Sequence, residues 1–262
     1  MQPYRVSTMT CNGKVGAPCV DLLKFYTNLR LQDGFVWTDY KGSLPRGTNP
    51  KKLSPTRKVF DNQVTVIFKA ETDAGTVFYP NVKLFRNGSM TITGVRKPAD
   101  GEKIIEAMAL EIRRIATEDD AEIVSSVESV VGGDFSISMI NSDFVKPFEI
   151  RRKELHKLLI SNDYGNQCIF QPGLYPGVKL QYFYNTEATE KDGICKCSEH
   201  CIGKGKGTGD KQCKKVTVCI FESGKILITG GNSYAQIDEA YAFINGVFAD
   251  NLNALRKPPA AA

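Results

Sequence analysis

Two segments of the chain share one alternation of apolar and other residues around a central turn. The later segment runs from Val218 to Gly230, and the earlier one runs from Val82 to Gly94. Val, Phe, Gly, Ile, Thr and Gly recur in both segments at identical offsets. A two-residue period predicts strands that each give one side to a core. The recurrence of the segment indicates an internal duplication.

The other elements follow the same order in each half of the chain. Apolar residues at helical spacing predict a closing helix in each half, starting near Ala99 and at Ile237–Phe248. Shorter helices are predicted at 16–29 and 148–160. Further strands are predicted at 6–10, 35–40, 64–69, 77–85, 90–94, 136–140 and 178–184. The predicted fold class is α+β, a tandem repeat in which helices cover one face of an antiparallel sheet.

Insertions and a linker divide this repeated pattern. A polar loop at 41–58 carries several lysines and arginines and is either a solvated loop or a phosphate contact. The charged and glycine-containing stretch between the halves reads as a linker. We expect a first repeat at 1–117, a linker at 118–133, a second repeat at 134–257 with a cysteine-rich insertion at 186–213, and a tail at 258–262.

Composition narrows the class of protein. The 262 residues carry a net charge of +5, which permits a polyanionic partner without requiring one. No apolar run approaches the roughly 20 residues of a membrane helix, and the N-terminus does not resemble a signal peptide. We therefore expect an intracellular protein that does not contact membranes. The only histidines are His156 and His200, and no catalytic constellation is evident, so we expect no enzyme.

The sheet face turned away from the helices has an unusual composition. If Ile220, Ile226 and Ile228 point toward the helices, their strand neighbours point the other way. An uncovered face with aromatic, apolar and hydroxyl side chains, rimmed by basic residues, indicates a binding surface. The alternative is a second core. The residues concerned are Phe85, Thr91, Thr93, Thr217, Cys219, Phe221, Leu227 and Thr229.

Three motifs resemble the saddle domain of the TATA-box-binding protein (TBP) family. They are Ile220-Phe-Glu-Ser-Gly-Lys-Ile-Leu-Ile-Thr-Gly230, Gln236-Ile-Asp-Glu-Ala-Tyr241 and Leu174-Tyr-Pro-Gly177. The resemblance covers nearly the whole chain in both halves, and the cysteine-rich insertion is similar to TBP-like proteins of giant (nucleocytoplasmic large) DNA viruses. It implies a pseudo-twofold saddle, a ten-stranded curved antiparallel sheet with four helices on its convex side. In that family the concave side binds the DNA minor groove, and paired phenylalanines kink the duplex by roughly 80°.

The resemblance also implies DNA-binding residues. Phe85 and Phe221 match one wedge of each pair, with Phe60 and Tyr175 as their partners. Thr93 and Thr229 match threonines that reach the groove, and Lys225 matches a lysine of the phosphate-contacting type. The other residues that fall on groove positions are Val6, Lys83, Thr91, Ser138, Ile140, Thr217 and Leu227.

Several residues of this chain differ from the family's residues at groove positions, and these differences change the predicted DNA sequence preference. The family's central asparagine pair falls on Tyr4 and Ser138, and Lys83 stands where the family is apolar. Because the minor groove separates A·T from G·C chiefly by the guanine amino group, such changes predict a relaxed or non-TATA preference. The predicted function is sequence-selective minor-groove binding and bending of double-stranded promoter DNA by a transcription initiation factor. The alternative is a protein-interaction adaptor that has lost specific DNA binding.

The resemblance further implies partners and a place of action. An RNA polymerase or other initiation factors are expected to join the promoter complex. Contact with general transcription factor IIB is doubtful, because Gln171 and Gly173 replace the acidic residues that hold it in the cellular protein. A viral protein of this kind would act in the host nucleus or in a viral factory.

The cysteine-rich insertion gathers metal-ligand residue types. Thiolates and an imidazole at this density are typical of tetrahedral zinc, which would order the loop. Free thiols and a disulfide are the alternatives, and the sequence does not select four ligands from the five. The candidates are Cys195, Cys197, His200, Cys201 and Cys213.

Overall fold

The computed structural model describes residues 3–41, 43–51, 60–119, 121–198, 201 and 204–258. Most of the basic insertion lies inside this range, but residues 42 and 52–59 lie outside it, as do His200 and residues 259–262 of the tail. The chain forms two compact units: Thr8–Ser138 is the first unit, and Met1–Ser7 with Met139–Ala262 is the second. None of the described helices combines the length and the apolar character that crossing a membrane requires.

The first unit is an antiparallel sheet with two helices. Its strands are hydrogen-bonded in the order β1-β8-β7-β4-β2-β3, and a separate hairpin joins β5 to β6. Helices α1 (Leu22–Asn28) and α2 (Pro98–Glu118) belong to this unit. The strands are β1 (Arg5–Lys14), β2 (Phe35–Asp39), β3 (Arg46–Gly47), β4 (Gln63–Phe68), β5 (Ala70–Glu71), β6 (Val77–Phe78), β7 (Asn81–Phe85) and β8 (Ser89–Val95).

The second unit repeats this plan. Its strands follow the order β10-β11-β12-β13-β9. The strands are β9 (Gly133–Val145), β10 (Gln167–Ile169), β11 (Val178–Tyr184), β12 (Lys214–Ile220) and β13 (Lys225–Gly231). The helices are α3 (Arg152–Leu159), α4 (Tyr234–Asp250) and α5 (Leu252–Leu255). Strands β1 and β9 each begin in one unit and end in the other.

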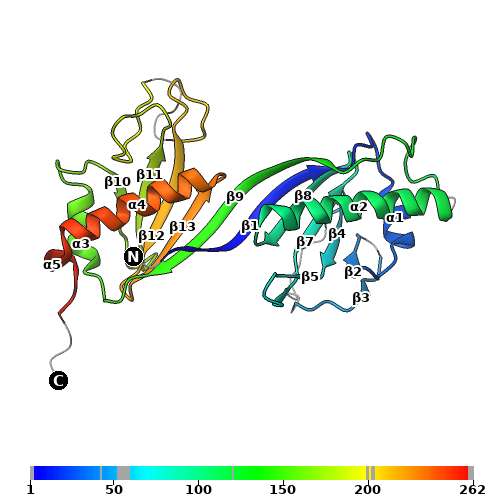
Figure 1. The fold of residues 1–262 in the computed structure, drawn as a ribbon, viewed down its shortest axis with the longest axis horizontal. Helices are drawn as coiled ribbons and strands as arrows, with labels where there is room; N and C mark the ends of the chain where they lie inside the picture. Colours follow the sequence, from blue (N-terminus) through cyan, green and yellow to red (C-terminus); the bar gives the residue numbers. More distant parts are fainter. Residues whose placement is uncertain are drawn as a thin grey trace. The chain divides into compact units, whose positions relative to one another are not determined.

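Alternate residues of the duplicated strands form the core of each unit. Val218, Ile220, Ile226 and Ile228 are all 0% exposed, and helix α4 lies across their strands (Figure 1). Helix α2 packs in the same way on β8 of the first unit. The predicted α+β tandem repeat with helices on one sheet face is therefore confirmed. The large sheet has eleven strands, not ten, and the described residues form five helices, not four.

Local chemistry moves several predicted boundaries. Helix α1 starts at Leu22, later than predicted, because the Asp21 carboxylate caps it by accepting from the Lys24 amide (3.0 Å). The predicted strand 77–85 breaks into β6 and β7 around Pro80, which has no amide hydrogen for a sheet ladder. Helix α3 starts at Arg152, since Ile150 forms a β-bridge with Arg256 near the C-terminal end.

Candidate nucleic-acid face and cysteine cluster

The open face of each unit is the sheet face opposite its helices, α4 in the second unit and α2 in the first. In the second unit Thr217 lies opposite Thr229, and Cys219 lies opposite Leu227. Cys219 is 8% exposed and the other three are half-buried. Because the residues between them are fully buried against α4, these four side chains point away from the helices. Their DNA-binding role stays a prediction.

An aromatic pair lies at one end of the open face of the second unit. The ring centroids of Tyr175 and Phe221 are 5.7 Å apart, and the Lys179 ammonium lies 3.9 Å from the Tyr175 ring centroid. Burial, together with a hydrogen bond to Cys219, raises the pKa of Tyr175 to about 12. A Cβ at Gly177 would lie 2.8 Å from the Tyr175 ring and 3.2 Å from the Phe221 ring, so glycine is needed for both rings to fit. The structure thus brings together the two wedges predicted for this half.

The first unit carries a more polar open face. Lys83 lies opposite Thr91, and Asn12 lies on the other side of Thr91. The Asn12 amide donates to the Ser138 hydroxyl (2.6 Å) and accepts from Thr91 (3.4 Å). Thr93 lies in the next row of side chains along the same strand. Asn12 was not among the predicted contacts, because only the strand pairing shows which residues of β1 share a row with Thr91.

The two aromatic residues predicted for the first unit are not paired in the same way. Phe60 is 52% exposed, with the Lys83 ammonium 6.0 Å from its ring centroid. Among the described residues no ring contact joins Phe60 to Phe85, which is half-buried at the end of β7. Val64 and Val178 occupy equivalent positions, opposite Leu84 and Ile220.

Those equivalent valines fix the alignment of the two aromatic residues. Phe60 precedes Val64 by four residues, whereas Tyr175 precedes Val178 by three. Phe60 is therefore displaced by one residue from the position that Tyr175 holds in the second half. The sequence motifs predict equivalent positions for Phe60 and Tyr175. The strand register instead places them one residue apart.

Two predicted groove contacts are wrong. Ile140 is 0% exposed and belongs to the core, because it lies on the helix side of β9. Val6 lies between Arg5 and Ser7, which both bond to Asp143 of the open face, so strand alternation turns Val6 to the opposite face. Lys225, the remaining predicted contact, is exposed, as is Ser138.

The start of the chain places an unpredicted ion pair on the open face of the second unit. Tyr4, aligned with a family asparagine, instead faces α4, where its hydroxyl donates to Asp238 (2.6 Å) and its ring lies 5.3 Å from Tyr241. The next residue, Arg5, bonds to Asp143, which lies opposite Leu227. No local sequence pattern marks this pair, because its members are 138 residues apart.

The charge of Asp143 is stabilised where it lies. Burial alone would raise the pKa of Asp143, but hydrogen bonds from the Ser7 hydroxyl and the Arg5 guanidinium hold it below its usual value. The nearby positive charge of Lys225 acts in the same direction. Asp143 is therefore an ionised, nearly buried carboxylate on a face whose predicted ligand is an anion.

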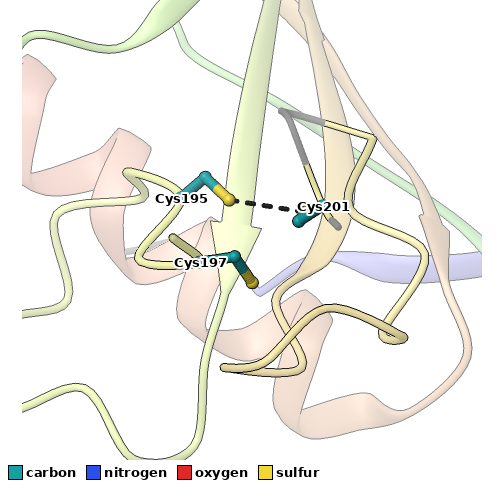
Figure 2. A group of neighbouring side chains, drawn as sticks. All are labelled: Cys195, Cys197 and Cys201. Carbon is teal, nitrogen blue, oxygen red and sulfur yellow. Dashed lines mark hydrogen bonds between the residues drawn. The ribbon is translucent and has the colours of Figure 1, made fainter. Parts of the chain in front are cut away.

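The cysteine-rich insertion joins β11 to β12 and gathers four thiols. The sulfurs of Cys195, Cys197 and Cys201 lie within 4.8 Å of one another, and Figure 2 shows these three side chains with the contact between Cys195 and Cys201 as a dashed line. Cys213 is fully buried in a cluster with Cys201 and Phe183, against which Cys195 and Cys197 pack. The Sγ atoms of Cys195 and Cys201 are 3.5 Å apart, and the cysteines are not bonded as disulfides. Four sulfurs around one zinc would be about 3.8 Å apart, given Zn–S bonds of about 2.3 Å.

Backbone amides are directed at each of the four sulfurs. The Lys196 amide donates to the Cys213 sulfur (3.3 Å), and the Gly205 amide donates to the Cys201 sulfur (3.2 Å). The Cys197 amide donates to the Cys195 sulfur. The amides of Cys213 and Lys211 donate to the Cys197 sulfur. Such bonds stabilise thiolates, which are the metal-binding form of cysteine.

The pKa values of two of these thiols bear on whether the cluster needs a metal cation to hold its cysteines as thiolates. Burial raises the pKa of Cys195 to about 12. Burial alone would also raise the pKa of Cys197, but its hydrogen bonds with the Cys213 and Lys211 amides bring that pKa below its usual value. A bound cation would stabilise the thiolate forms of these neighbouring cysteines, so the donor set fits a soft divalent metal. The cluster can hold a metal without His200.

Comparisons with known proteins agree with the fold. The chain has the fold of TBP: it aligns with the TBP of Methanococcus jannaschii at a TM-score of 0.52 and 14% identity, over 95% of this chain and 99% of that one. It is 28% identical over 265 residues to the "TATA-box-binding protein-like" protein of Acanthamoeba polyphaga mimivirus, covering 94% of this chain and 65% of that protein. No protein-family model matches. These findings confirm the resemblance to the TBP family and to TBP-like proteins of giant DNA viruses.

Proposed function

We propose that the chain binds the minor groove of duplex DNA and bends it, as a TBP-like transcription initiation factor with a relaxed or non-TATA preference. The observation that carries the proposal is the Tyr175–Phe221 pair at the end of an open sheet face. Aromatic wedges at such a position can enter a base step, and hydroxyl side chains beside them can reach minor-groove acceptors. The chain spans 65% of the length of its mimivirus relative, and the proposal concerns this chain alone.

The relaxed preference rests on the residues of the open face. Asn12, Ser138 and Thr91 form a hydrogen-bonded polar row in the first unit. Hydroxyl and amide groups can accept from the guanine amino group as well as donate to A·T acceptors. A face with this mixture does not exclude G·C pairs as strictly as a tightly apolar one. The proposal assigns no chemical reaction to the chain.

One observation favours the alternative of a protein-interaction adaptor. Asp143 places a carboxylate on the open face of the second unit, and a carboxylate near a polyanion is unfavourable unless it is paired. An adaptor would place a protein partner on this face. Its DNA binding would be weak, salt-labile and independent of sequence.

Selection from random duplexes, followed by binding and bending assays, separates the two functions. The proposal expects an enriched sequence other than a strict TATA consensus. It also expects binding that survives moderate salt, and a bend measurable by fluorescence transfer between labelled duplex ends. A TATA consensus would contradict the altered preference. Binding without enrichment or bending would favour the adaptor.

We further propose that the cysteine cluster holds one zinc ion, with Cys195, Cys197, Cys201 and Cys213 as ligands. The ion would tie the insertion to the ends of β11 and β12 and supply binding energy to the fold. Cys201→Ser is expected to lose the metal, and Cys19→Ser is a matched control because Cys19 is exposed in the other unit. Metal analysis of purified protein tests this. Zinc well below one equivalent in the wild type, or full zinc in Cys201→Ser, would contradict the proposal.

A further inference from the structure

The Nε group of the Arg5 side chain is bonded to a carboxylate, whereas the terminal groups of its guanidinium are exposed to solvent. Its Nε lies 3.1 Å from both carboxylate oxygens of Asp143. The Arg5 side chain is 77% exposed, whereas that of Asp143 is 9% exposed. Within the part of the chain that the structure describes, the terminal Nη groups of Arg5 make no hydrogen bond. Asp143 therefore fixes the base of the guanidinium, and its outer edge faces solvent with four N–H donors.

We propose that Arg5 is a minor-groove contact of the second unit, oriented by Asp143; this inference rests on the proposed DNA-binding function. An A·T pair shows only acceptors in the minor groove, whereas a G·C pair adds the guanine amino donor. Because a guanidinium donates and never accepts, its outer edge matches A·T pairs. The strong negative potential of a narrow groove adds to this attraction. Prior orientation by Asp143 reduces the side-chain entropy lost on binding.

The same arrangement explains how Asp143 is tolerated beside DNA. Its charge is balanced by Arg5, and the Ser7 hydroxyl donates to it as well. In this geometry Arg5 has two roles: it neutralises the Asp143 carboxylate, and it presents hydrogen-bond donors to the groove. The two tasks predict different behaviour when both charged residues are removed.

The first unit has no charged pair at the matching position. Asn12 lies opposite Thr91 as Asp143 lies opposite Leu227, and Thr91 and Leu227 are equivalent in the duplication. Asn12 donates to Ser138, a neutral contact. The open faces of the two units therefore differ in charge at this position. An A·T preference is expected opposite the second unit alone, which would give the protein one orientation on its site.

Binding to the selected duplex, measured for the full chain by fluorescence anisotropy, tests the inference. Arg5→Ala is expected to weaken binding by about tenfold or more, the range of one good base contact. Arg151→Ala is the matched control, because Arg151 is an exposed arginine at the start of α3 whose side chain makes no capping bond. It is expected to change affinity less than about threefold, the effect of one distant charge. Circular dichroism and urea unfolding check that each variant is folded.

The double variant Arg5→Ala/Asp143→Ala separates contact from neutralisation. If Arg5 contacts the groove, the double variant still binds more weakly than the wild type, because it regains only the part of the loss that the unpaired Asp143 carboxylate causes. If Arg5 only neutralises Asp143, removing both charges restores wild-type affinity, which would overturn the inference.

Base analogues give an independent readout of the same contact. Diaminopurine in place of one adenine adds a minor-groove amino group, which is expected to weaken the wild type and to leave Arg5→Ala unchanged. Equal sensitivity of both proteins at every position would overturn the inference while leaving the proposed function intact. Absence of duplex binding by the wild type would overturn the proposed function and this inference together.

Discussion

Phe221→Ala tests whether the aromatic pair is a DNA wedge or part of a second core. Phe221 is half-buried on the open face, and among the described residues its ring contact is with Tyr175, at 5.7 Å between centroids. Such a ring pair contributes about 0.5–1.5 kcal/mol beyond area burial. Truncating a fully packed phenylalanine costs about 3–5 kcal/mol. A wedge therefore predicts a loss of unfolding free energy of about 1–2 kcal/mol, below the core value.

The effect on DNA is expected to be larger than the effect on folding. Bending a site of 20–30 base pairs by 40–90° costs about 1–6 kcal/mol, which the inserted side chains must help to offset. Without the Phe221 ring the bend angle is expected to fall, and the affinity to fall by about 10- to 100-fold, or about 1.4–2.8 kcal/mol. Urea unfolding gives the first quantity. Fluorescence transfer across a labelled duplex gives the second.

Phe243→Ala is the matched control for this experiment. Phe243 is also half-buried, but it lies on α4, with its ring centroid 5.2 Å from that of Tyr182. It is expected to lower stability by a similar amount and to leave the bend unchanged. A stability loss above about 3 kcal/mol for Phe221→Ala, with wild-type bending by the remaining folded protein, would show that Phe221 is a core residue.

Three further predictions concern the metal cluster, the open face and the core. Gly209→Ala is expected to lower zinc content, because a Cβ there would lie 2.8 Å from the Cys197 sulfur, and unchanged zinc by metal analysis would refute this. The Asp143 pKa is lowered by folding, so its charge stabilises the fold above the unfolded-state pKa of about 3.9 and the effect is lost as pH falls below that value. The stability gap between wild type and Asp143→Asn in urea unfolding is therefore expected to narrow from pH 6 to pH 3, and a constant gap would contradict it. Tyr182→Phe removes the bond from a fully buried hydroxyl to Glu239 (2.9 Å) and is expected to cost about 1.5–3 kcal/mol in urea unfolding, with no change contradicting the reasoning.

Much of the fold could be predicted from local pattern. The duplicated strands show their core side directly, since Ile226 and Ile228 alternate with Leu227 and Thr229 and the burial follows that alternation. The closing helices were equally readable, because Ile237 and Ile244 at helical spacing both became fully buried against the sheet. Period-two and helical patterns arise from backbone geometry within a few residues, so one sequence suffices to read them.

The candidate site could be predicted only in part, because the sheet face that a side chain occupies depends on strand pairing and not on local pattern alone. Tyr175 and Phe221 were predicted as partners from the family motif, and their rings do meet. Ile140 and Val6 were assigned to the open face although they point away from it. A one-residue difference in strand register moves a side chain to the other face, and motif spacing does not fix the register of β1 and β9.

The sequence by itself therefore determined the duplication, the fold class, the core stripe of each repeated strand and the residue types available for metal binding. The tertiary structure alone decided which thiols meet, because Cys213 joins Cys195, Cys197 and Cys201 only when the insertion folds back onto the ends of two strands. It also decided that Arg5, not Tyr4, faces outward beside Asp143. Both outcomes depend on contacts between residues far apart in the chain. Such contacts are set by strand pairing and by the packing of helices, and neither leaves a local periodicity to read.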